Sequence, residues 1–462
     1  MLDLLLKNGK VYLEGVFSDA VVGVKDGKIA VIAEPGCEFD AKEVIDLGGQ
    51  YLIPGAVDTH MHVRDPGHTE RGNFYTETLA AAAGGVTTIM EHPISVPPQY
   101  NAEILDGRIA RAEAQCVVDF CFYGAMGGEY PEEITKLAED GRIVAFKTFL
   151  HAAPNGRYEE FKGLTTADDG QMITVMQELA KTDLFCAFHA EDNDLCNFLT
   201  QKCKDEGYIT GKAHAVSRPV LAEVQSVERV LRFAKATGAK VEIAHVSTPD
   251  AMELINKARA EGVKVYAETC PHYLFLNEED LEKYGPFAKC NPPVRSQELV
   301  DKLWDYVNDG TVDYIGSDHS PFLLSEKTRG IDDIFAATSG FPGVDLRLPL
   351  MLHGVMEGKT TLEKVIELVC VNPAKKFNIY PQKGIIRVGA DADFAVFNFD
   401  HTTVVDKNKN YSHARDIAVP YDGWELKCQL TYTILRGRIL MKDGVVDESA
   451  KAYGKLVTPN KK

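Results

Sequence analysis

The chain reads Leu52-Ile-Pro-Gly-Ala-Val-Asp58-Thr-His60-Met-His62-Val-Arg64-Asp65-Pro-Gly67 between residues 52 and 67. Its first six residues are mostly apolar, a pattern typical of a strand buried on both faces of a parallel sheet. Residues two apart on a strand point to the same side, so His60 and His62 should project together beyond the strand's carboxyl end. Two neutral imidazoles that converge on one point are a candidate site for a first-row metal ion. The alternative is a pair of polar residues on an exposed strand end.

The composition excludes several classes of protein. The 462-residue chain has a formal net charge of −18, and its 10 cysteines form no Cys-x-x-Cys pair. The acidic excess argues against binding nucleic acid or an anionic membrane, and the cysteine pattern is typical of reduced thiols. The first residues lack the basic start and long apolar core of a signal peptide, and no later stretch is long enough to span a bilayer. We therefore expect a cytoplasmic protein.

The order of the expected elements predicts the architecture. Before residue 51, short alternating strands separated by turn dipeptides are typical of a small antiparallel β unit. After it, strands alternate with helical segments, which indicates a parallel sheet. The expected strands are 51–58, 86–91, 117–124, 143–149, 184–190, 240–246, 264–270 and 312–317. Eight strands with intervening helices, such as 76–83, 102–114, 170–181, 220–237 and 249–261, favour a barrel over an open sheet.

β character returns near the carboxyl end, at residues 384–387, 393–397, 403–405 and 430–444. Because this pattern matches the first 50 residues, we expect both chain ends to combine. The predicted fold class is α/β: a (β/α)₈ TIM-type barrel flanked by a small β-sandwich domain built from both chain ends. The predicted boundaries are 51–377 for the barrel, with 1–50 and 378–462 as the two parts of the β domain.

Further polar side chains stand at the expected strand ends, where the chemistry of such barrels takes place. Lys147 lies in an otherwise apolar strand, and its alternative role is to extend its amine from the strand end to water. His189 and His245 end the fifth and sixth strands, where each taken alone would be a hydrogen-bonded core residue. Asp318 ends the eighth strand. Five strand ends that carry ionisable groups at one rim indicate a shared site.

These residues resemble a known signature. His60-x-His62, Lys147, His189, His245 and Asp318 are similar to the binuclear metal site of the amidohydrolase superfamily, in its cyclic amidohydrolase branch of dihydroorotase, allantoinase and hydantoinase/dihydropyrimidinase. The resemblance covers nearly the whole chain. It includes Pro54-Gly55, Ala81-Ala-Ala-Gly-Gly-Val-Thr-Thr88, Cys270-Pro-His-Tyr273 and Gly389-Ala-Asp-Ala-Asp-Phe394.

The resemblance implies a hydrolase that needs two divalent metal ions, usually zinc. It implies that CO₂ carbamylates Lys147 and that the carbamate bridges the metals. It assigns one metal ion to His60, His62 and Asp318 and the other to His189 and His245. Two metals about 3.5–4 Å apart can share a hydroxide, which would attack a ring amide carbonyl. Asp318 would take the proton and return it to the leaving nitrogen; the alternative for Asp318 is that it only orients a histidine.

The substrate follows less directly from the motifs. Hydantoinases typically carry a tyrosine five residues after the lysine, where this chain has Ala152, and dihydroorotases typically read Pro-Asn after the second strand, where this chain reads Glu91-His-Pro-Ile-Ser95. These departures make the chain most similar to allantoinase, which implies allantoin as the small cyclic substrate. The alternatives are dihydroorotase and then hydantoinase/dihydropyrimidinase. The run 288–293 also resembles allantoinase, and its Asn291 is a candidate substrate-binding residue.

Arg64 favours the alternative substrate. The spacing His-x-His-x-Arg resembles dihydroorotase, in which an arginine can pair with a substrate carboxylate. The other reading of Arg64 is a surface ion pair with Asp65 or Glu70. A non-enzymatic scaffold protein is the competing class, but all six metal-site positions are filled here. By resemblance we also expect a homo-oligomer, a tetramer or dimer.

Overall fold

A parallel barrel forms the centre of the molecule. The computed structural model describes residues 1–154 and 156–460, and in that part of the chain eight parallel strands are paired in sequence order. They are β6 (Ala56–Met61), β7 (Val86–Glu91), β8 (Asp119–Ala125), β9 (Ile143–Phe149), β10 (Cys186–His189), β11 (Val241–Ile243), β12 (Val265–Thr269) and β13 (Tyr314–Ile315). A parallel bridge between Met61 and His319 brings the two ends of the sheet together, so the barrel is nearly closed.

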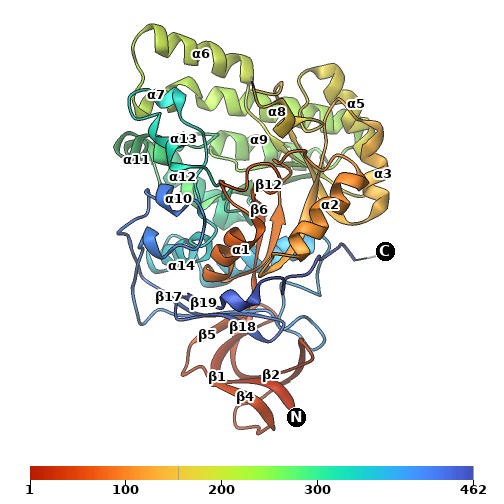
Figure 1. Cartoon of the computed structure of the whole chain (residues 1–462), viewed down its shortest axis with the longest axis vertical. Helices are drawn as coiled ribbons and strands as arrows, with labels where there is room; N and C mark the ends of the chain where they lie inside the picture. Colours follow the sequence, from red (N-terminus) through yellow and green to blue (C-terminus); the bar gives the residue numbers. More distant parts are fainter. Residues whose placement is uncertain (155, 461–462) are drawn as a thin grey trace.

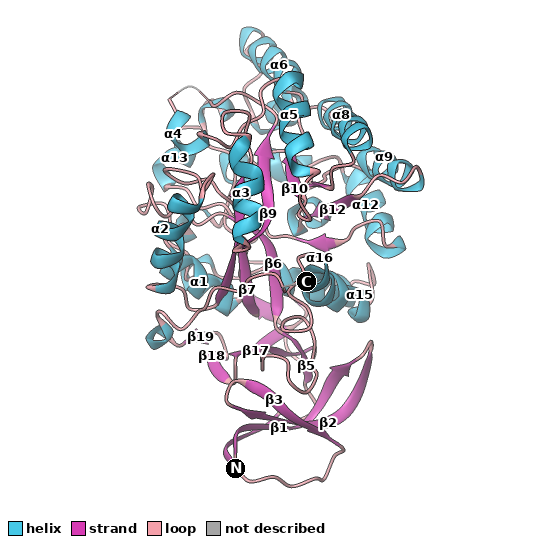
Figure 2. Cartoon of the chain, turned by 90° about the vertical axis from the view of Figure 1, so that its right-hand side faces the viewer, coloured by secondary structure: helices cyan, strands magenta, loops and turns pink. Residues whose placement is uncertain are grey.

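Helices surround the barrel, as Figure 2 shows. They are α1 (Phe74–Ala83), α2 (Ala102–Glu113), α3 (Glu132–Asp140), α4 (Tyr158–Phe161), α5 (Asp169–Leu179), α6 (Asn193–Asp205), α7 (Gly211–Ser217), α8 (Val220–Thr237), α9 (Pro249–Ala260), α10 (Pro271–Phe275), α11 (Glu278–Tyr284), α12 (Gln297–Asp309), α13 (Leu324–Thr328), α14 (Arg347–Met356), α15 (Leu362–Ile366) and α16 (Asn372–Lys376). Local sequence sets their starts: the Asn73 side chain accepts from the Thr76 amide and closes a capping box at α1.

A second sheet below the barrel combines both ends of the chain (Figure 1). It contains β1 (Leu2–Leu13), β2 (Val16–Lys25), β3 (Lys28–Ala33), β4 (Ala41–Asp46), β5 (Tyr51–Pro54), β14 (Phe394–Asn398), β17 (Gln429–Leu435), β18 (Arg438–Lys442) and β19 (Val445–Val446). Its pairs are mostly antiparallel, and β5 joins the two ends because it pairs with both β1 and β14. A separate short pair is formed by β15 (Thr403–Val404) and β16 (Glu425–Leu426).

The predicted fold class is confirmed, with two corrections to single strands. The predicted strand 51–58 is two strands, because the chain leaves β5 in the outer sheet and enters β6 in the barrel at Gly55. A Cβ at Gly55 would lie 2.2 Å from the Thr87 hydroxyl oxygen, so only glycine fits this crossing. Residues 384–387, predicted as a strand, have none of the ladder pairing that defines one. The domain boundaries stay a prediction.

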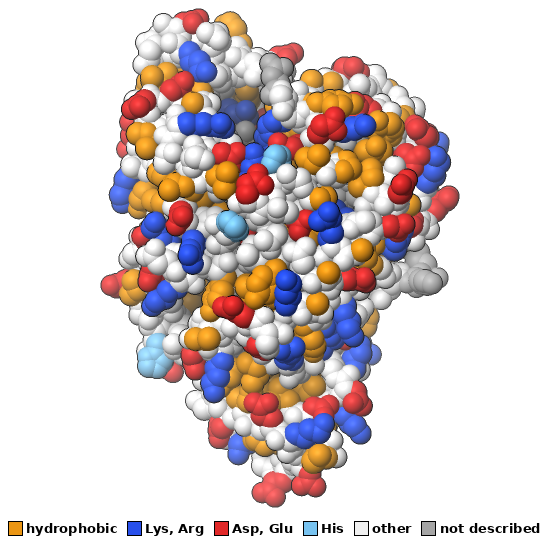
Figure 3. All heavy atoms as spheres, in the orientation of Figure 1, with side chains coloured by type: hydrophobic (Ala, Val, Ile, Leu, Met, Phe, Trp, Pro, Cys, Tyr) orange, Lys and Arg blue, Asp and Glu red, His pale blue; other side chains and the backbone are white. Residues whose placement is uncertain are grey.

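Acidic and basic side chains are interspersed over the face shown in Figure 3. Within residues 1–154 and 156–460, every helix is too short or too polar to cross a bilayer.

A buried lysine joins the barrel to the outer sheet. The Lys383 ammonium lies 2.5 Å from the Asp119 carboxylate on β8, 2.6 Å from Asp393 and 3.0 Å from Asp391. Arg436, beside β17, also pairs with Asp119. The carboxylates raise the pKa of Lys383 above its ordinary value despite the burial, so the charge is retained. This ion cluster therefore connects strands from the two sheets.

We predict that Lys383→Met destabilises the fold. Removing one partner of a buried charge cluster leaves carboxylates without a counter-charge and costs about 3–5 kcal/mol. The measurement is the midpoint of urea unfolding. Lys302→Met is the control, because Lys302 forms a solvent-exposed pair with Glu298, and such pairs contribute little to stability. Equal midpoints for the two variants would contradict the prediction.

Candidate active site

The candidate residues surround one cavity. It has a volume of about 650 Å³ and lies at the carboxyl ends of the barrel strands. All the site residues predicted from the sequence line it, including Arg64 and Asn291. Because parallel strands end at one rim, residues as far apart as 60 and 318 meet here. Their assignment as metal ligands stays a prediction.

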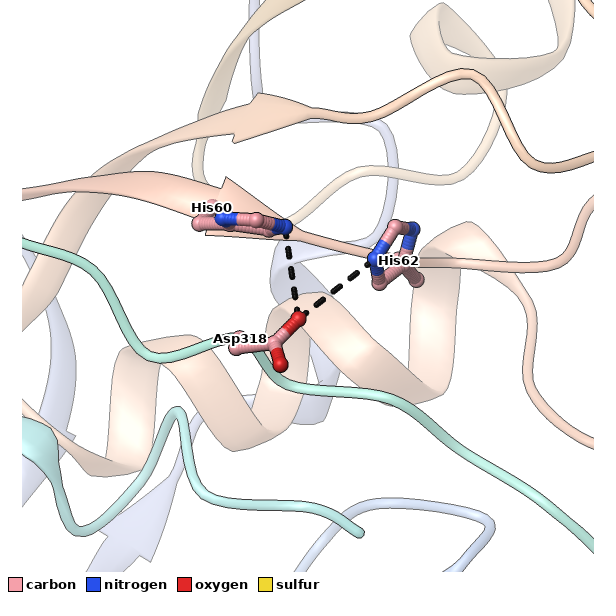
Figure 4. Close-up of side chains that lie close together, drawn as sticks. All are labelled: His60, His62 and Asp318. Atoms are coloured by element: carbon pink, nitrogen blue, oxygen red, sulfur yellow. Dashed lines mark ion pairs between the residues drawn. The ribbon is translucent and has the colours of Figure 1, made fainter. Parts of the chain in front are cut away.

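His60 and His62 converge on Asp318 (Figure 4). Both histidines come from the end of β6, and the aspartate comes from the loop after β13. The Nε2 atoms of His60 and His62 lie 3.3 and 3.6 Å from the same carboxylate oxygen of Asp318. One nitrogen of each ring and a carboxylate oxygen thus lie close enough together to hold a single metal ion.

Glu268 on β12 fixes the orientation of the His60 ring. Its carboxylate lies 2.6 Å from Nδ1 of His60 and accepts a hydrogen bond of 2.7 Å from the Thr59 hydroxyl. This contact places the proton on Nδ1 and leaves Nε2 as a lone pair that faces Asp318. On the other side, the His92 ring stacks on His60 with 3.7 Å between ring centroids. The imidazole is therefore held in one orientation.

His189 and His245 form a second pair of facing rings. Nδ1 of His189 lies 3.1 Å from Nε2 of His245. Nε2 of His189 donates to Glu191, whose carboxylate also accepts from Arg218 at 2.6 Å. That proton position leaves Nδ1 of His189 as an acceptor facing His245. Two ring nitrogens that face each other in this way are arranged to share a cation.

Lys147 lies between the two histidine pairs and is fully buried on β9. Its amine has no hydrogen-bond partner in the described chain. Burial lowers the pKa of Lys147 from its ordinary value, although Glu242, Glu268 and Asp318 oppose the shift. The alternative of an amine that reaches water from the strand end is therefore wrong.

Burial also controls the protonation of the surrounding groups. It lowers the pKa of His60, His62 and His245 well below the ordinary histidine value, and nearby cations add to the effect. Burial raises the pKa of Asp318 to about 7. Neutral imidazoles are the form that binds metals, and the unpartnered amine of Lys147 lies among them. The residues present thus fit a pair of divalent metal ions.

Arg64 lies inside the cavity wall with only 3% of its surface exposed. It donates to the Ser320 hydroxyl at 2.5 Å, and its guanidinium lies 4.7 Å from the Phe322 ring centroid. Two further nitrogens, Nε and Nη1, have no partner in the described residues. Burial lowers the pKa of Arg64 to about 9, which still leaves the side chain charged at neutral pH.

The alternative reading of Arg64 as a surface ion pair is wrong. Asp65 lies within reach of Arg111 and Gln115 instead, and Glu70 contacts His68. Arg64 turns away from these neighbours because its backbone has a φ of +70°. This conformation directs the side chain to Ser320 and the cavity rather than to the surface.

Polar side chains line the cavity wall around the histidines. The Asn291 side-chain oxygen is buried and has no hydrogen-bond partner in the part of the chain that the structure describes. Ala152 occupies the position where a hydantoinase typically has a tyrosine. The other hydrogen-bonding groups of the wall include Asn193, Asn197, Ser320 and Ser339.

Sequence reasoning missed some of the residues that shape this site. Glu268 is a carboxylate in an otherwise apolar strand, the same signal that singled out Lys147, and it was available in the sequence. His92 directly follows the predicted strand 86–91, so its strand-end position was also a signal available in the sequence. Arg218 carried no such signal, because it lies between α7 and α8 and contacts the site only after folding.

Comparisons with known proteins agree with this geometry. The model of the amidohydrolase family matches residues 51–440. The chain belongs to the amidohydrolase family. Among its relatives in that family, L-hydantoinase of Paenarthrobacter aurescens is 34% identical over 99% of this chain and 98% of its own length. Allantoinase of Bacillus velezensis is also 34% identical, with the same coverage. The solved structure of L-hydantoinase (dihydropyrimidinase) from Arthrobacter aurescens matches 99% of this chain and 100% of its own, with a TM-score of 0.94.

These relatives establish the class of reaction. This amidohydrolase is an enzyme that hydrolyses carbon–nitrogen bonds in small cyclic amides. The alternative of a non-enzymatic scaffold protein is therefore set aside. The relatives named L-hydantoinase and allantoinase have the same sequence identity to this chain, so identity alone does not distinguish between their substrates.

Proposed function

We propose that this enzyme hydrolyses a five-membered cyclic ureide, with allantoin as the substrate. The observation that carries the proposal is a group of polar side chains, Asn291, Ser320 and the guanidinium of Arg64, which line the same cavity as the histidines. Allantoin carries a ureido group on its ring, and such a wall can hydrogen-bond that group. An apolar ring substituent would leave these buried polar groups unpaired, which costs binding energy.

We propose two divalent metal ions, zinc by resemblance, as the cofactors. His60, His62 and Asp318 would hold one ion and His189 and His245 the other, with a carbamate on Lys147 between them. When bound, such a pair supplies a hydroxide at neutral pH and polarises the amide carbonyl. The buried, partner-free amine of Lys147 supports the carbamate, because a neutral amine attacks CO₂ to form the N–C bond and releases one proton.

Asp318 is proposed as the group that moves the proton. Burial raises its pKa to about 7, so this carboxylate takes up a proton more readily than an exposed aspartate does. The contacts with His60 and His62 fix the carboxylate over the rim. It would take the proton of the attacking water and give it to the ring nitrogen as the amide bond breaks.

A ring that carries a carboxylate, as dihydroorotate does, is the second candidate substrate. The observation that favours it is the pair of unpartnered nitrogens on the buried guanidinium of Arg64. Each of these two nitrogens can donate a charged hydrogen bond to a carboxylate oxygen. The two candidates differ in charge, so a direct assay separates them.

The test of the proposed function is a turnover screen of the metal-loaded enzyme with allantoin, dihydroorotate, dihydrouracil and a hydantoin that bears an apolar substituent. We expect allantoin to have the highest kcat/KM. A preference for dihydroorotate, with no turnover of allantoin, would replace the first candidate by the second.

A homo-oligomeric assembly, tetramer or dimer, is proposed by analogy with the family and is checked by the mass of the protein in solution.

We predict that Lys147→Ala loses most of its activity and that short carboxylic acids restore part of it. The methyl side chain leaves a space between the histidine pairs that a small carboxylate can occupy. Activity is measured with and without added acetate, and metal content is measured in parallel. Lys376→Ala is the control, because Lys376 pairs with Asp313 away from the cavity. Full activity of Lys147→Ala would remove the lysine from the mechanism.

We predict that Asp318→Asn keeps its fold but loses kcat by about 10²–10⁴-fold, the usual contribution of a general acid–base group. The amide is nearly isosteric and cannot carry the proton. The measurements are kcat and the bound metal per chain. A variant that binds metal normally and turns over at the normal rate would show that Asp318 only orients its neighbours.

We predict that Arg64→Ala distinguishes the two candidate substrates. If Arg64 holds a carboxylate, the variant has a lower kcat/KM for dihydroorotate. The loss corresponds to roughly 1.5–3 kcal/mol of transition-state stabilisation, the value of one charged hydrogen bond, or to more if both donors are used. If allantoin is the substrate, its kcat/KM changes much less. The matched control is Arg111→Ala, an exposed arginine that contacts Asp65 outside the cavity.

A further inference from the structure

One wall of the cavity is a loop rather than a strand end. It begins in the short 3₁₀ turn Ile334–Ala336, and residues 335–340 all line the cavity opposite the histidines. Its amides make three backbone bonds to other segments, from Ile334 to Ile209, from Thr338 to Glu326 and from Gly340 to Lys289. Beyond the short turn the loop belongs to no helix or strand, yet it contributes a large part of the cavity wall.

Lys289 reaches this loop from the segment before Asn291. Its amine lies 2.8 Å from the carbonyl oxygen of Ile334 and 2.6 Å from that of Ala337. Only 5% of the residue is exposed. The two hydrogen bonds attach both ends of one turn of the loop to the same nitrogen atom.

Lys327 holds the loop from the other side. It belongs to α13 and is fully buried. Its amine donates to the carbonyl of Thr338 at 3.0 Å, and also to those of Pro286 at 2.9 Å and Lys289 at 3.3 Å. It therefore ties the loop to the segment that carries the first lysine.

The two lysines are unusual because backbone carbonyls are their hydrogen-bond acceptors. Neither forms a salt bridge within residues 1–154 and 156–460. Burial lowers the pKa of Lys327 to about 7 and the pKa of Lys289 well below its ordinary value. Burying two amines without carboxylates is unfavourable, so general stability does not explain their presence.

We propose that Lys289 and Lys327 are positioning residues that hold residues 334–340 in place as a wall of the substrate cavity. Three carbonyl groups of this segment, those of Ile334, Ala337 and Thr338, accept hydrogen bonds from the two amines. Two further bonds from Lys327, to Pro286 and Lys289, tie the same amine to the neighbouring segment. The ring of the substrate then meets a preformed surface, and binding does not have to order the loop. The proposal rests on this cavity being the cyclic-amide site.

The first test needs no activity. Hydrogen–deuterium exchange is followed in the unaltered protein and in Lys289→Met and Lys327→Met, which keep the apolar stem and remove the amine. Exchange in residues 334–340 should rise by about 10-fold or more in each variant, while the barrel strands stay protected. Lys383→Met is the control, since it removes a buried lysine that lies away from the loop.

Unchanged exchange in the loop of both methionine variants would overturn the proposal. An increase in loop exchange no larger than that seen in Lys383→Met would also overturn the proposal, because that result indicates general destabilisation. If the methionine variants do not fold, the unaltered protein decides: loop amides that exchange as fast as those of an unfolded peptide exclude a held wall.

The second test is kinetic. With a cyclic amide that the unaltered enzyme hydrolyses, each methionine variant should raise KM by about 10-fold and leave kcat within about threefold, because a displaced wall weakens binding in ground and transition states alike. Lys327→Arg, which keeps donors at this position, should recover part of the KM. An unchanged KM in folded variants with normal metal content would overturn the proposal. If the unaltered enzyme hydrolyses none of the cyclic amides, the proposed function fails, and the exchange experiment still tests the loop.

Discussion

The burial of Lys147 without a hydrogen-bond partner is the constraint on which the site depends. An ammonium at this position would lie among imidazoles and carboxylates with no water to stabilise it, and burial shifts it towards the neutral amine. The same low-dielectric environment keeps His60 and His245 neutral and raises the pKa of Asp318. Every group at the rim is therefore in a protonation state suited to metal binding or proton transfer.

A set of carboxylates behind the rim makes this arrangement specific. Glu268 fixes the tautomer of His60, and Glu191 does the same for His189 while Arg218 balances its charge. These contacts direct one nitrogen of each ring to the cavity. The orientation of these imidazoles is thus set by residues outside the predicted ligand set.

Four buried lysines in this fold have different roles because their partners differ. Lys383 meets three carboxylates and keeps its charge, which joins the barrel to the outer sheet. Lys289 and Lys327 meet carbonyl oxygens and hold a loop. Lys147 has no hydrogen-bond partner among residues 1–154 and 156–460, which leaves its amine free. The side chain is the same in each case, so the surrounding hydrogen-bond acceptors determine whether a buried lysine joins two sheets, holds a loop or keeps a free amine.

The sequence by itself determined the barrel, the outer sheet and the six rim residues, because strand periodicity and the βα rhythm are local and place strand-end residues on one edge. It did not determine where Arg64 points, that the strand divides at Gly55, or that Glu268 supports His60. Arg64 is buried by Ser320 and Phe322, which lie more than 250 residues away in the chain. Glu268 and His60 are 208 residues apart. Such contacts depend on how the barrel closes, so only the tertiary structure decided them.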